Sequence, residues 1–272
     1  MGQATIALAV PHTPWVPARV ESMTRLRQQL QLTRVGPHRG PYREFTDREP
    51  NWSWSVKLWE WLHETGAEWC LQLQDDVIVA PCFWPALRAM LASLPPQGEI
   101  VGLSSVHPLA PEWARRGHRW YRTPSLLVGW AYAIRRDTLW AFLRVRERLV
   151  ERHGKACEDV LLGNFAAESE KSVWHPCPTI VDHDTSIQSS YANDSHSTRR
   201  PQVTWRDFGE GSMTDPTWWM PSGLPALLPL PAQRVCWMCQ QRGVVGEAPN
   251  GVGVCGLCIG SLLGHMLQGG RP

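Results

Sequence analysis

Residues 69–77 join a short apolar run to two adjacent carboxylates, and they read Trp-Cys-Leu-Gln-Leu-Gln-Asp-Asp-Val. The composition of residues 68–74 predicts a buried β-strand. Neighbouring acids at a strand end repel each other unless a cation lies beside them. A hard divalent cation such as Mn²⁺ or Mg²⁺, shared with a diphosphate, meets that need with few protein ligands. A surface turn in which Asp75 caps the next element explains the same residues, and both interpretations stay open at this point.

Strand-like and helix-like segments alternate on both sides of this run. Further strands are predicted at residues 5–10, 100–104 and 174–181, with a strand pair made by Trp120 and residues 126–134. Helices are predicted at residues 16–30, 52–64, 137–152 (capped by Asp137) and 158–168. This alternation favours an α/β fold with a mostly parallel sheet covered by helices on both faces. Ligands of such sheets lie at the carboxyl ends of the strands.

A second strand end carries a histidine flanked by acids, because residues 178–186 read Pro-Thr-Ile-Val-Asp-His-Asp-Thr-Ser. Most isolated histidines are core or surface residues without a ligand. A histidine at a strand end is better placed than most to join a cation held by another strand end. We therefore name Asp76 and His183 as candidate ligands of Mn²⁺ or Mg²⁺.

The order of these segments resembles that of GT-A fold glycosyltransferases, the Rossmann-like class that uses nucleotide-sugar donors. The resemblance spans about residues 4–190, and its motifs are short. Gln74, Asp75 and Asp76 stand where this family carries its DxD-type motif. The resemblance implies that Asp76 binds the metal on the donor diphosphate. Gln74 departs from a strict DxD, so Asp75 is expected to share the contact with the ribose.

Two further segments are similar to the family's donor-binding elements. Pro11, His12 and Thr13 follow the first predicted strand, where the family holds the nucleotide base. His183 is followed by a serine-rich turn, which the resemblance matches to Ser189 as a donor contact. The resemblance implies a sugar donor of the UDP type.

The segment Cys-Glu-Asp-Val-Leu at residues 157–161 resembles the family's acceptor-activating element. The resemblance implies that Asp159 removes the proton from the acceptor hydroxyl and that Glu158 orients the acceptor. Acids at a helix start, favoured by the helix dipole, are the structural alternative. Residues 129–132, Gly-Trp-Ala-Tyr, resemble the family's acceptor-side strand, where a small residue lets the substrate approach. An inverting reaction needs a single in-line displacement, and a retaining reaction stays open.

Four cysteines near the C-terminus form two CxxC pairs separated by 15 residues. This spacing predicts a zinc ribbon bound by Cys236, Cys239, Cys255 and Cys258. Two disulfides are the alternative, but the start of the chain has neither a basic segment nor a cleavage site typical of a secretory signal. We therefore expect a reducing, cytoplasmic location and structural Zn²⁺.

The charge and hydropathy of the 272-residue chain do not indicate a membrane protein or an obvious polyanion partner. The formal net charge is +2, the mean hydropathy is −0.28, and no run reaches the roughly 18 apolar residues of a membrane span. Residues 113–136, however, contain six arginines and no acidic residue. Interleaved aromatic residues suit base stacking among cations. A solvated arginine-rich face explains the same pattern.

For the acceptor we favour DNA that carries a 5-hydroxymethylated pyrimidine, as in bacteriophage DNA, with Trp120, Arg122 and Trp130 as contacts. The expected location is then the cytoplasm of an infected bacterial host. A protein or surface glycan is the alternative acceptor, and a non-catalytic nucleic-acid or protein-binding module is the alternative class. The predicted organisation is a GT-A domain at residues 1–196, a Pro/Trp-rich linker or strap at 197–234 and a zinc ribbon at 235–272.

Overall fold

The computed structural model describes ten segments of the chain. They are residues 4–31, 40–46, 51–104, 106–153, 158–187, 201, 203–208, 211–221, 244–247 and 253–255. The helices are α1 (Pro17–Gln29), α2 (Asn51–Glu64), α3 (Phe83–Ser93), α4 (Ala110–Arg115), α5 (Arg136–His153) and α6 (Glu158–Glu168). The strands of the main body are β1 (Ile6–Pro11), β2 (Tyr42–Phe45), β3 (Trp69–Leu73), β4 (Val77–Val79), β5 (Ile100–Gly102), β6 (Trp120–Thr123), β7 (Ala131–Arg135), β8 (Val173–Pro176) and β9 (Val181–His183).

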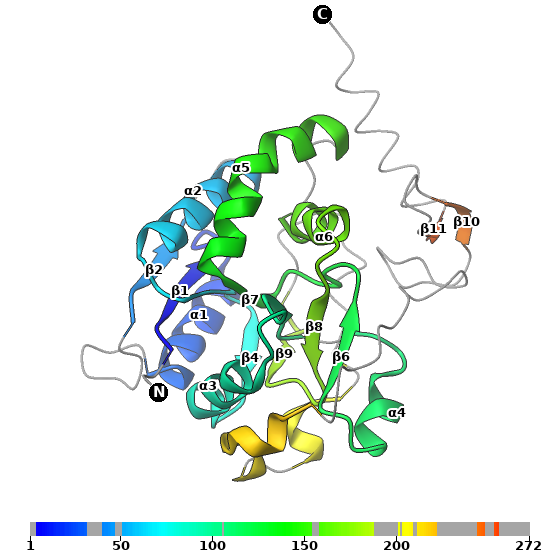
Figure 1. Ribbon diagram of the computed structural model, residues 1–272. Coiled ribbons are helices and arrows are strands. Elements are labelled where there is room, and N and C mark those ends of the chain that lie inside the picture. The colour runs from blue at the N-terminus through cyan, green and yellow to red at the C-terminus, as the bar shows by residue number, and fades with distance from the viewer. Residues whose placement is uncertain are drawn as a thin grey trace, which may run out of the picture.

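A seven-stranded sheet in the order β2-β1-β3-β7-β5-β8-β6 forms the centre of the molecule (Figure 1). Strand β1 is parallel to both β2 and β3, and β5 is parallel to β8. Strand β7 is antiparallel to β3 and β5, and β6 is antiparallel to β8. Five strands therefore run in one direction and β6 and β7 in the other. The prediction of an α/β fold with a mostly parallel sheet is confirmed.

Alternate residues of β1 separate the two faces of the sheet, as the two-residue period of a strand requires. Ile6, Leu8 and Val10 belong to a core cluster with residues of α1 and α3. Ala7 and Ala9 belong to a second cluster with residues of α2, α5 and α6. Helices thus cover both faces, and both strand faces are apolar because neither meets water. No helix in the described segments is long and apolar enough to cross a membrane.

Two predicted strand arrangements are wrong. Trp120 lies in β6 at the edge of the sheet, whereas residues 131–135 form β7 between β3 and β5. These strands are near each other in the sequence but β8 and β5 separate them, because pairing is decided by the whole sheet. The predicted strand at 174–181 is two strands, of which β9 pairs with β4 in a separate two-stranded sheet. Pro178 lies between them and cannot donate a ladder hydrogen bond.

The four predicted helices are present as α1, α2, α5 and α6, with bounds that differ by at most one residue. Asp137 is the second residue of α5, so it lies within the first turn and does not precede the helix. The strands β2 and β4 and the helices α3 and α4 were not predicted. Buried side chains in α3 lie on more than one side, because Trp84 and Ala89 are buried as well as Phe83, Leu87 and Met90, and this blurs the one-sided periodicity of a surface helix.

Described residues from the predicted strap pack into the core. Trp205, Met213 and Trp219 belong to the same cluster as α1 and α3. The indole nitrogen of Trp120 donates to the carbonyl oxygen of Trp219 at 2.6 Å. The indole of Trp219 in turn donates to the carbonyl oxygen of Met213 at 2.7 Å. This part of the chain therefore forms one body with the sheet.

Of the predicted zinc ribbon the structure describes a short antiparallel hairpin, β10 (Val244–Glu247) with β11 (Gly253–Cys255). Cys236, Cys239 and Cys258 lie outside the described residues, and only the backbone of Cys255 lies within them. The binding of zinc by these four cysteines stays a prediction.

Candidate active site

The strand order reverses between β1 and β3. The chain leaves β1 through α1 to β2 on one side, and returns through α2 to β3 on the other side. Helices α1 and α2 cover opposite faces of the sheet. In sheets of this kind a crevice opens at the carboxyl ends of the strands where the order reverses, and ligands bind there. His12 directly follows β1, and Gln74, Asp75 and Asp76 directly follow β3.

Asp75 attaches the loop after β1 to the end of β3. Its Oδ2 lies 2.9 Å from Nδ1 of His12 and accepts a hydrogen bond of 2.9 Å from the backbone N–H of Thr13. Its Oδ1 accepts a hydrogen bond from Nη1 of Arg19. Both carboxylate oxygens are therefore in use, and the residue is buried. Asp75 thus supports the predicted donor loop and does not cap the element that follows it.

Arg19, in the first turn of α1, lies between the two carboxylates. Its Nη2 donates to Oδ2 of Asp76 at 2.8 Å while Nη1 contacts Asp75. Burial alone would lower the pKa of Arg19, but the charges of Asp76 and Asp75 outweigh it and raise the pKa, so the guanidinium stays charged. A protein side chain thus supplies a cation that adjacent acids require.

The sequence did not lead us to Arg19, although it contained a signal. The first turn of a helix favours acids because its backbone N–H groups carry partial positive charge. An arginine in that turn, two residues after Pro17, is unfavourable unless a carboxylate faces it. The helix's rotation about its axis decides whether one does.

Asp76 keeps one carboxylate oxygen without a partner. Oδ2 accepts from Arg19 and lies 3.3 Å from Nε2 of His183, whereas Oδ1 has no hydrogen-bond partner although the side chain is 3% exposed. Burial would raise the pKa of Asp76, but His183 and Arg19 lower it, so the group is a carboxylate at neutral pH. Nδ1 of His183 is also buried without a partner. Such orphaned polar atoms in a buried site require an explanation.

The structure places His183 beside Asp76 through a small ladder. Val77 is paired with His183 in the β4–β9 sheet, and the backbone N–H of Asp184 donates to the carbonyl oxygen of Asp76 at 2.9 Å. The indole of Trp130 stacks on the His183 ring, with centroids 4.3 Å apart and planes at 9°. Trp130 also accepts, through its carbonyl oxygen, a 2.7 Å hydrogen bond from the N–H of Gln74.

Asp159 lies against the segment that carries Trp130. A Cβ atom added to Gly129 would lie 2.9 Å from Cβ of Asp159, so the glycine allows the start of α6 to approach this backbone. Oδ1 of Asp159 accepts a hydrogen bond from the N–H of Val160 at 2.9 Å. The predicted base is therefore packed one residue away from the ring that covers His183. The side chain of Glu158 and the whole of Ser189 lie outside the described residues.

Two of the predicted acceptor contacts lie elsewhere. Trp120 and Arg122 are in β6, which three strands separate from β3. Trp120 is 1% exposed and packs against Trp174 and Trp219, with centroids 6.1 and 5.9 Å away. The Arg122 guanidinium lies over the Trp174 ring at 5.7 Å. Trp120 therefore presents no ring surface for a base, and only Trp130 of the three lies at the carboxylate site.

The potential metal ligands at Asp76 and His183 suit a divalent cation that is also bound by a nucleotide. The described residues contain no cluster of three or more His, Cys, Asp or Glu side chains able to enclose a metal. Mg²⁺ and Mn²⁺ can bind through one or two protein ligands, with phosphate oxygens and waters completing the shell. The unpartnered Oδ1 of Asp76 and the adjacent imidazole of His183 meet that requirement.

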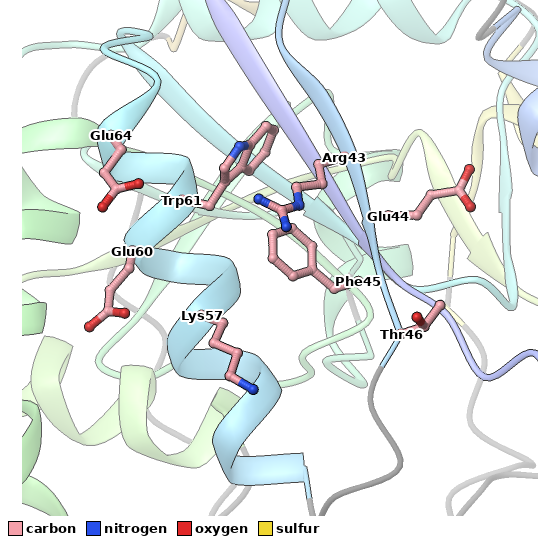
Figure 2. Close-up of a pocket in the computed structure, with 8 residues that line it drawn as sticks. All are labelled: Arg43, Glu44, Phe45, Thr46, Lys57, Glu60, Trp61 and Glu64. Atoms are coloured by element: carbon pink, nitrogen blue, oxygen red, sulfur yellow. The ribbon is translucent and has the colours of Figure 1, made fainter.

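A separate hollow of about 410 Å³ lies between β2 and α2 and contains none of these residues (Figure 2). The Arg43 guanidinium lies over the Phe45 ring at 5.0 Å, and Phe45 contacts Trp61 edge-on at 5.7 Å. Glu60 on its wall pairs with Arg146 at 2.8 Å. Its charges of both signs do not converge on one point, so we assign it no ligand.

Fold and site together define an α/β protein with a buried carboxylate pair at the reversal point of its sheet. No protein-family model matches the chain, and no curated protein does. Several solved structures are partly similar. A197 from STIV is 11% identical with a TM-score of 0.40, over 66% of this chain and 85% of that one.

Two nucleotide-binding enzymes are similar over shorter stretches. CMP:2-keto-3-deoxy-manno-octonic acid synthetase, complexed with CTP, is 16% identical with a TM-score of 0.33, over 63% of this chain and 89% of that one. Glucosyl-3-phosphoglycerate synthase from Mycobacterium tuberculosis, complexed with Mn²⁺, UDP and glucosyl-3-phosphoglycerate, is 16% identical with a TM-score of 0.32, over 56% of this chain and 67% of that one. Similarities at these TM-scores do not establish a family or an activity.

Proposed function

We propose that the protein is a glycosyltransferase that binds a nucleotide-sugar, of the UDP type, at the carboxyl ends of β1 and β3 and transfers the sugar to a hydroxyl. The observation that carries this proposal is the free, buried oxygen of Asp76 beside His183 at the reversal point of the sheet. The motif resemblance of residues 74–76, 157–161 and 178–190 supports the same activity.

The residues of the site have separable roles in this proposal. A divalent cation held by Asp76 and His183 would supply Lewis-acid assistance to the departing diphosphate. Asp75 holds the loop that carries His12 and Thr13 in place against the nucleotide. Trp15 in the same loop is 49% exposed and offers a ring on which the base stacks.

Asp159 is the proposed base on the acceptor side. Its carboxylate accepts the proton from the attacking hydroxyl, which makes the oxygen a better nucleophile. Trp130 links the two parts of the site, because its ring stacks on His183 and its neighbour Gly129 packs against Asp159. A single carboxylate base suits a single displacement with inversion, and a retaining reaction is the alternative.

The acceptor is a separate part of the proposal. Five of the six arginines in residues 113–136 have contacts within the chain: Arg116 with Glu112, Arg119 with Trp218, Arg122 with Trp174, Arg135 with Glu68 and Arg136 with Asp137. Trp120 is buried and Trp130 is only 8% exposed, so the support for a DNA surface is reduced to the exposed arginines, Arg115 and Arg116. We retain a 5-hydroxymethylated pyrimidine in DNA as the first acceptor to test, and a protein or glycan hydroxyl as the second.

The test is transfer from a panel of nucleotide sugars in the presence of Mn²⁺. Plain DNA, 5-hydroxymethylcytosine DNA, a peptide, a glycan and no acceptor are compared, and products are weighed by mass spectrometry. A mass gain of one sugar on an acceptor supports the proposal and identifies the acceptor class. No turnover of any donor contradicts it.

Two variants locate the chemistry. Asp159→Asn is expected to lower kcat by about 10²-fold or more, the usual effect of losing a general base. Asp76→Asn is expected to abolish Mn²⁺-dependent turnover. Asp137→Asn is the control for both, because the Asp137 side chain on α5 is 92% exposed and its change is expected to leave turnover unaffected. If the wild-type protein turns over no donor and Asp76→Asn binds nucleotide as tightly as the wild type, the protein is a binding module and not an enzyme.

A further inference from the structure

We propose that Arg19 is a positioning residue that makes divalent-cation binding depend on the nucleotide. It holds the carboxylate pair in the free protein, so that the cation binds tightly only together with a nucleoside diphosphate. This inference rests on the proposed function for its ligand and goes beyond it in assigning an order of binding and the residue that sets it.

The first argument is the use of the four carboxylate oxygens. Three of them are engaged: both oxygens of Asp75 by Arg19, His12 and Thr13, and Oδ2 of Asp76 by Arg19. Only Oδ1 of Asp76 has no partner. The free protein therefore offers one carboxylate oxygen and one imidazole, fewer ligands than a tight Mg²⁺ or Mn²⁺ site built from protein alone.

The second argument is the charge. Two carboxylates and one guanidinium leave a single negative charge, and the guanidinium touches both acids. Arg19 is 6% exposed, so its positive charge is poorly screened by solvent and opposes a second cation. A diphosphate contributes both negative charge and oxygen ligands. The cation is then bound by Asp76, His183 and phosphate oxygens, while Arg19 keeps Oδ2 of Asp76 and leaves Oδ1 facing the cation.

A purely structural role for Arg19 is the competing explanation. In that case the guanidinium ties α1 to the end of β3 and its removal lowers stability without changing the ligand requirement of the cation. Cation affinity measured in the absence of nucleotide separates the two roles, because the structural role predicts no gain.

The experiment measures Mn²⁺ binding to the full chain by electron paramagnetic resonance of the free ion, with and without UDP. We expect UDP to tighten Mn²⁺ binding to the wild-type protein by about tenfold or more, because it adds ligands and charge. We expect Arg19→Met to tighten the binding of Mn²⁺ alone by about tenfold, because it removes a cation and frees two carboxylate oxygens. Asp76→Asn is expected to lose binding under both conditions.

Arg25→Met is the matched control. Arg25 is on the same helix and pairs with Asp184 at 2.5 Å, next to His183, so its loss removes a charge without freeing Asp75 or Asp76. Because it also frees the carboxylate of Asp184, a small gain is allowed, and the gain in affinity for Mn²⁺ alone is expected to be clearly smaller than that of Arg19→Met. If Arg19→Met does not fold, as judged by circular dichroism, Arg19→Lys decides: it keeps the charge but cannot bridge both acids, and an intermediate gain is expected.

The inference is overturned if the wild-type protein binds Mn²⁺ equally tightly with and without UDP, or if the Arg19 variant that folds gains no more affinity than Arg25→Met. The proposed function has its own readout, which is sugar transfer. The expected Mn²⁺ pattern without turnover supports the inference while contradicting the transferase. Sugar transfer with no effect of the Arg19 variants on Mn²⁺ binding supports the transferase and contradicts the inference.

Discussion

The side chains around Asp75 and Asp76 show how two adjacent carboxylates can be buried when a buried cation pairs with both. Each carboxylate receives a hydrogen bond from the same guanidinium, so neither acid is left as an isolated buried charge. Breaking such a pair by removing one partner usually costs several kcal/mol, because the other charge stays buried. The same reasoning explains why the remaining free atom, Oδ1 of Asp76, points to a ligand.

Trp15 provides a test of nucleotide binding at this scale. Trp15→Ala is expected to raise the KM for the donor, and the Kd for UDP, by about tenfold with little change in kcat, because a stacked base contributes on the order of 1–3 kcal/mol. Isothermal titration with UDP measures the Kd. Trp140→Ala is the matched control, since Trp140 is also 49% exposed but lies on α5, stacked on His63. An equal loss in both variants would contradict the assignment of Trp15.

The residues of the site differ in how far the sequence predicts them. Asp76 and His183 follow strands, and the position of a strand end is visible in the hydrophobic pattern of one segment. The contact between Arg19 and the two acids depends on how α1 is rotated and docked, which no single segment encodes. Trp120 was misassigned because an aromatic residue among arginines has the same pattern whether it faces a ligand or the core.

Close approach between two elements controls the placement of Asp159. Helix α6 begins against Gly129, and any side chain there would force the helix start away. Gly129→Ala is expected to lower kcat by about tenfold or more while leaving the Kd for UDP unchanged, because small displacements of a base reduce its efficiency. Steady-state kinetics and UDP titration measure the two effects.

Gly163→Ala is the control for that prediction. Gly163 is also on α6, and an added Cβ would meet the side chain of Ser125, not Asp159. A similar fall in kcat in both variants would mean that any shift of α6 impairs the enzyme, and the particular role of Gly129 would be withdrawn.

A salt link between α1 and β2 makes stability depend on pH. Nε and Nη2 of Arg27 donate to the carboxylate of Glu44 at 2.8 and 2.5 Å, and Tyr42 also donates to it. Burial would raise the pKa of Glu44, but these hydrogen bonds outweigh it and lower the pKa. The carboxylate therefore adds stability that is complete above its unfolded pKa, about 4.3, and is lost as the pH falls through the lower folded value.

Glu44→Gln is accordingly expected to reduce the free energy of unfolding at pH 7 and to flatten its decline below about pH 5. Urea denaturation at a series of pH values between neutrality and acid measures both. Glu112→Gln, which breaks an exposed pair with Arg116, is expected to change little. Parallel pH curves for the wild type and Glu44→Gln would contradict the prediction.

At the scale of the whole molecule, four of the helices follow from the local sequence whereas the strand order does not. The predicted bounds of α1, α2, α5 and α6 differ from the observed ones by at most one residue, because a helix is decided mainly within one segment of the chain. The insertion of β7 between β3 and β5 is a long-range choice among strands of similar composition. It determines the site as well, since it brings Trp130 beside the end of β3.

Described residues between 201 and 221 pack against the sheet. Trp219 is fully buried, and Trp120 donates its indole hydrogen bond to the Trp219 carbonyl. Trp219→Ala is expected to lower the free energy of unfolding by about 3–5 kcal/mol, the usual effect of emptying a large buried site. Denaturant titration followed by circular dichroism measures this. Met220→Ala, at a neighbouring residue that is 65% exposed, is the control, and equal effects of the two changes would contradict the packing role.

The separate β4–β9 ladder has a consequence for how the protein can diverge. Asp76 and His183 are spaced by a two-stranded sheet with its own register, in which Val77 pairs with His183, and not by the seven-stranded sheet. Insertions and substitutions at the β6 edge of the large sheet can therefore accumulate without changing that spacing. Over evolutionary time the edge of the molecule can acquire new recognition surfaces while the geometry of Asp76 and His183 stays constant.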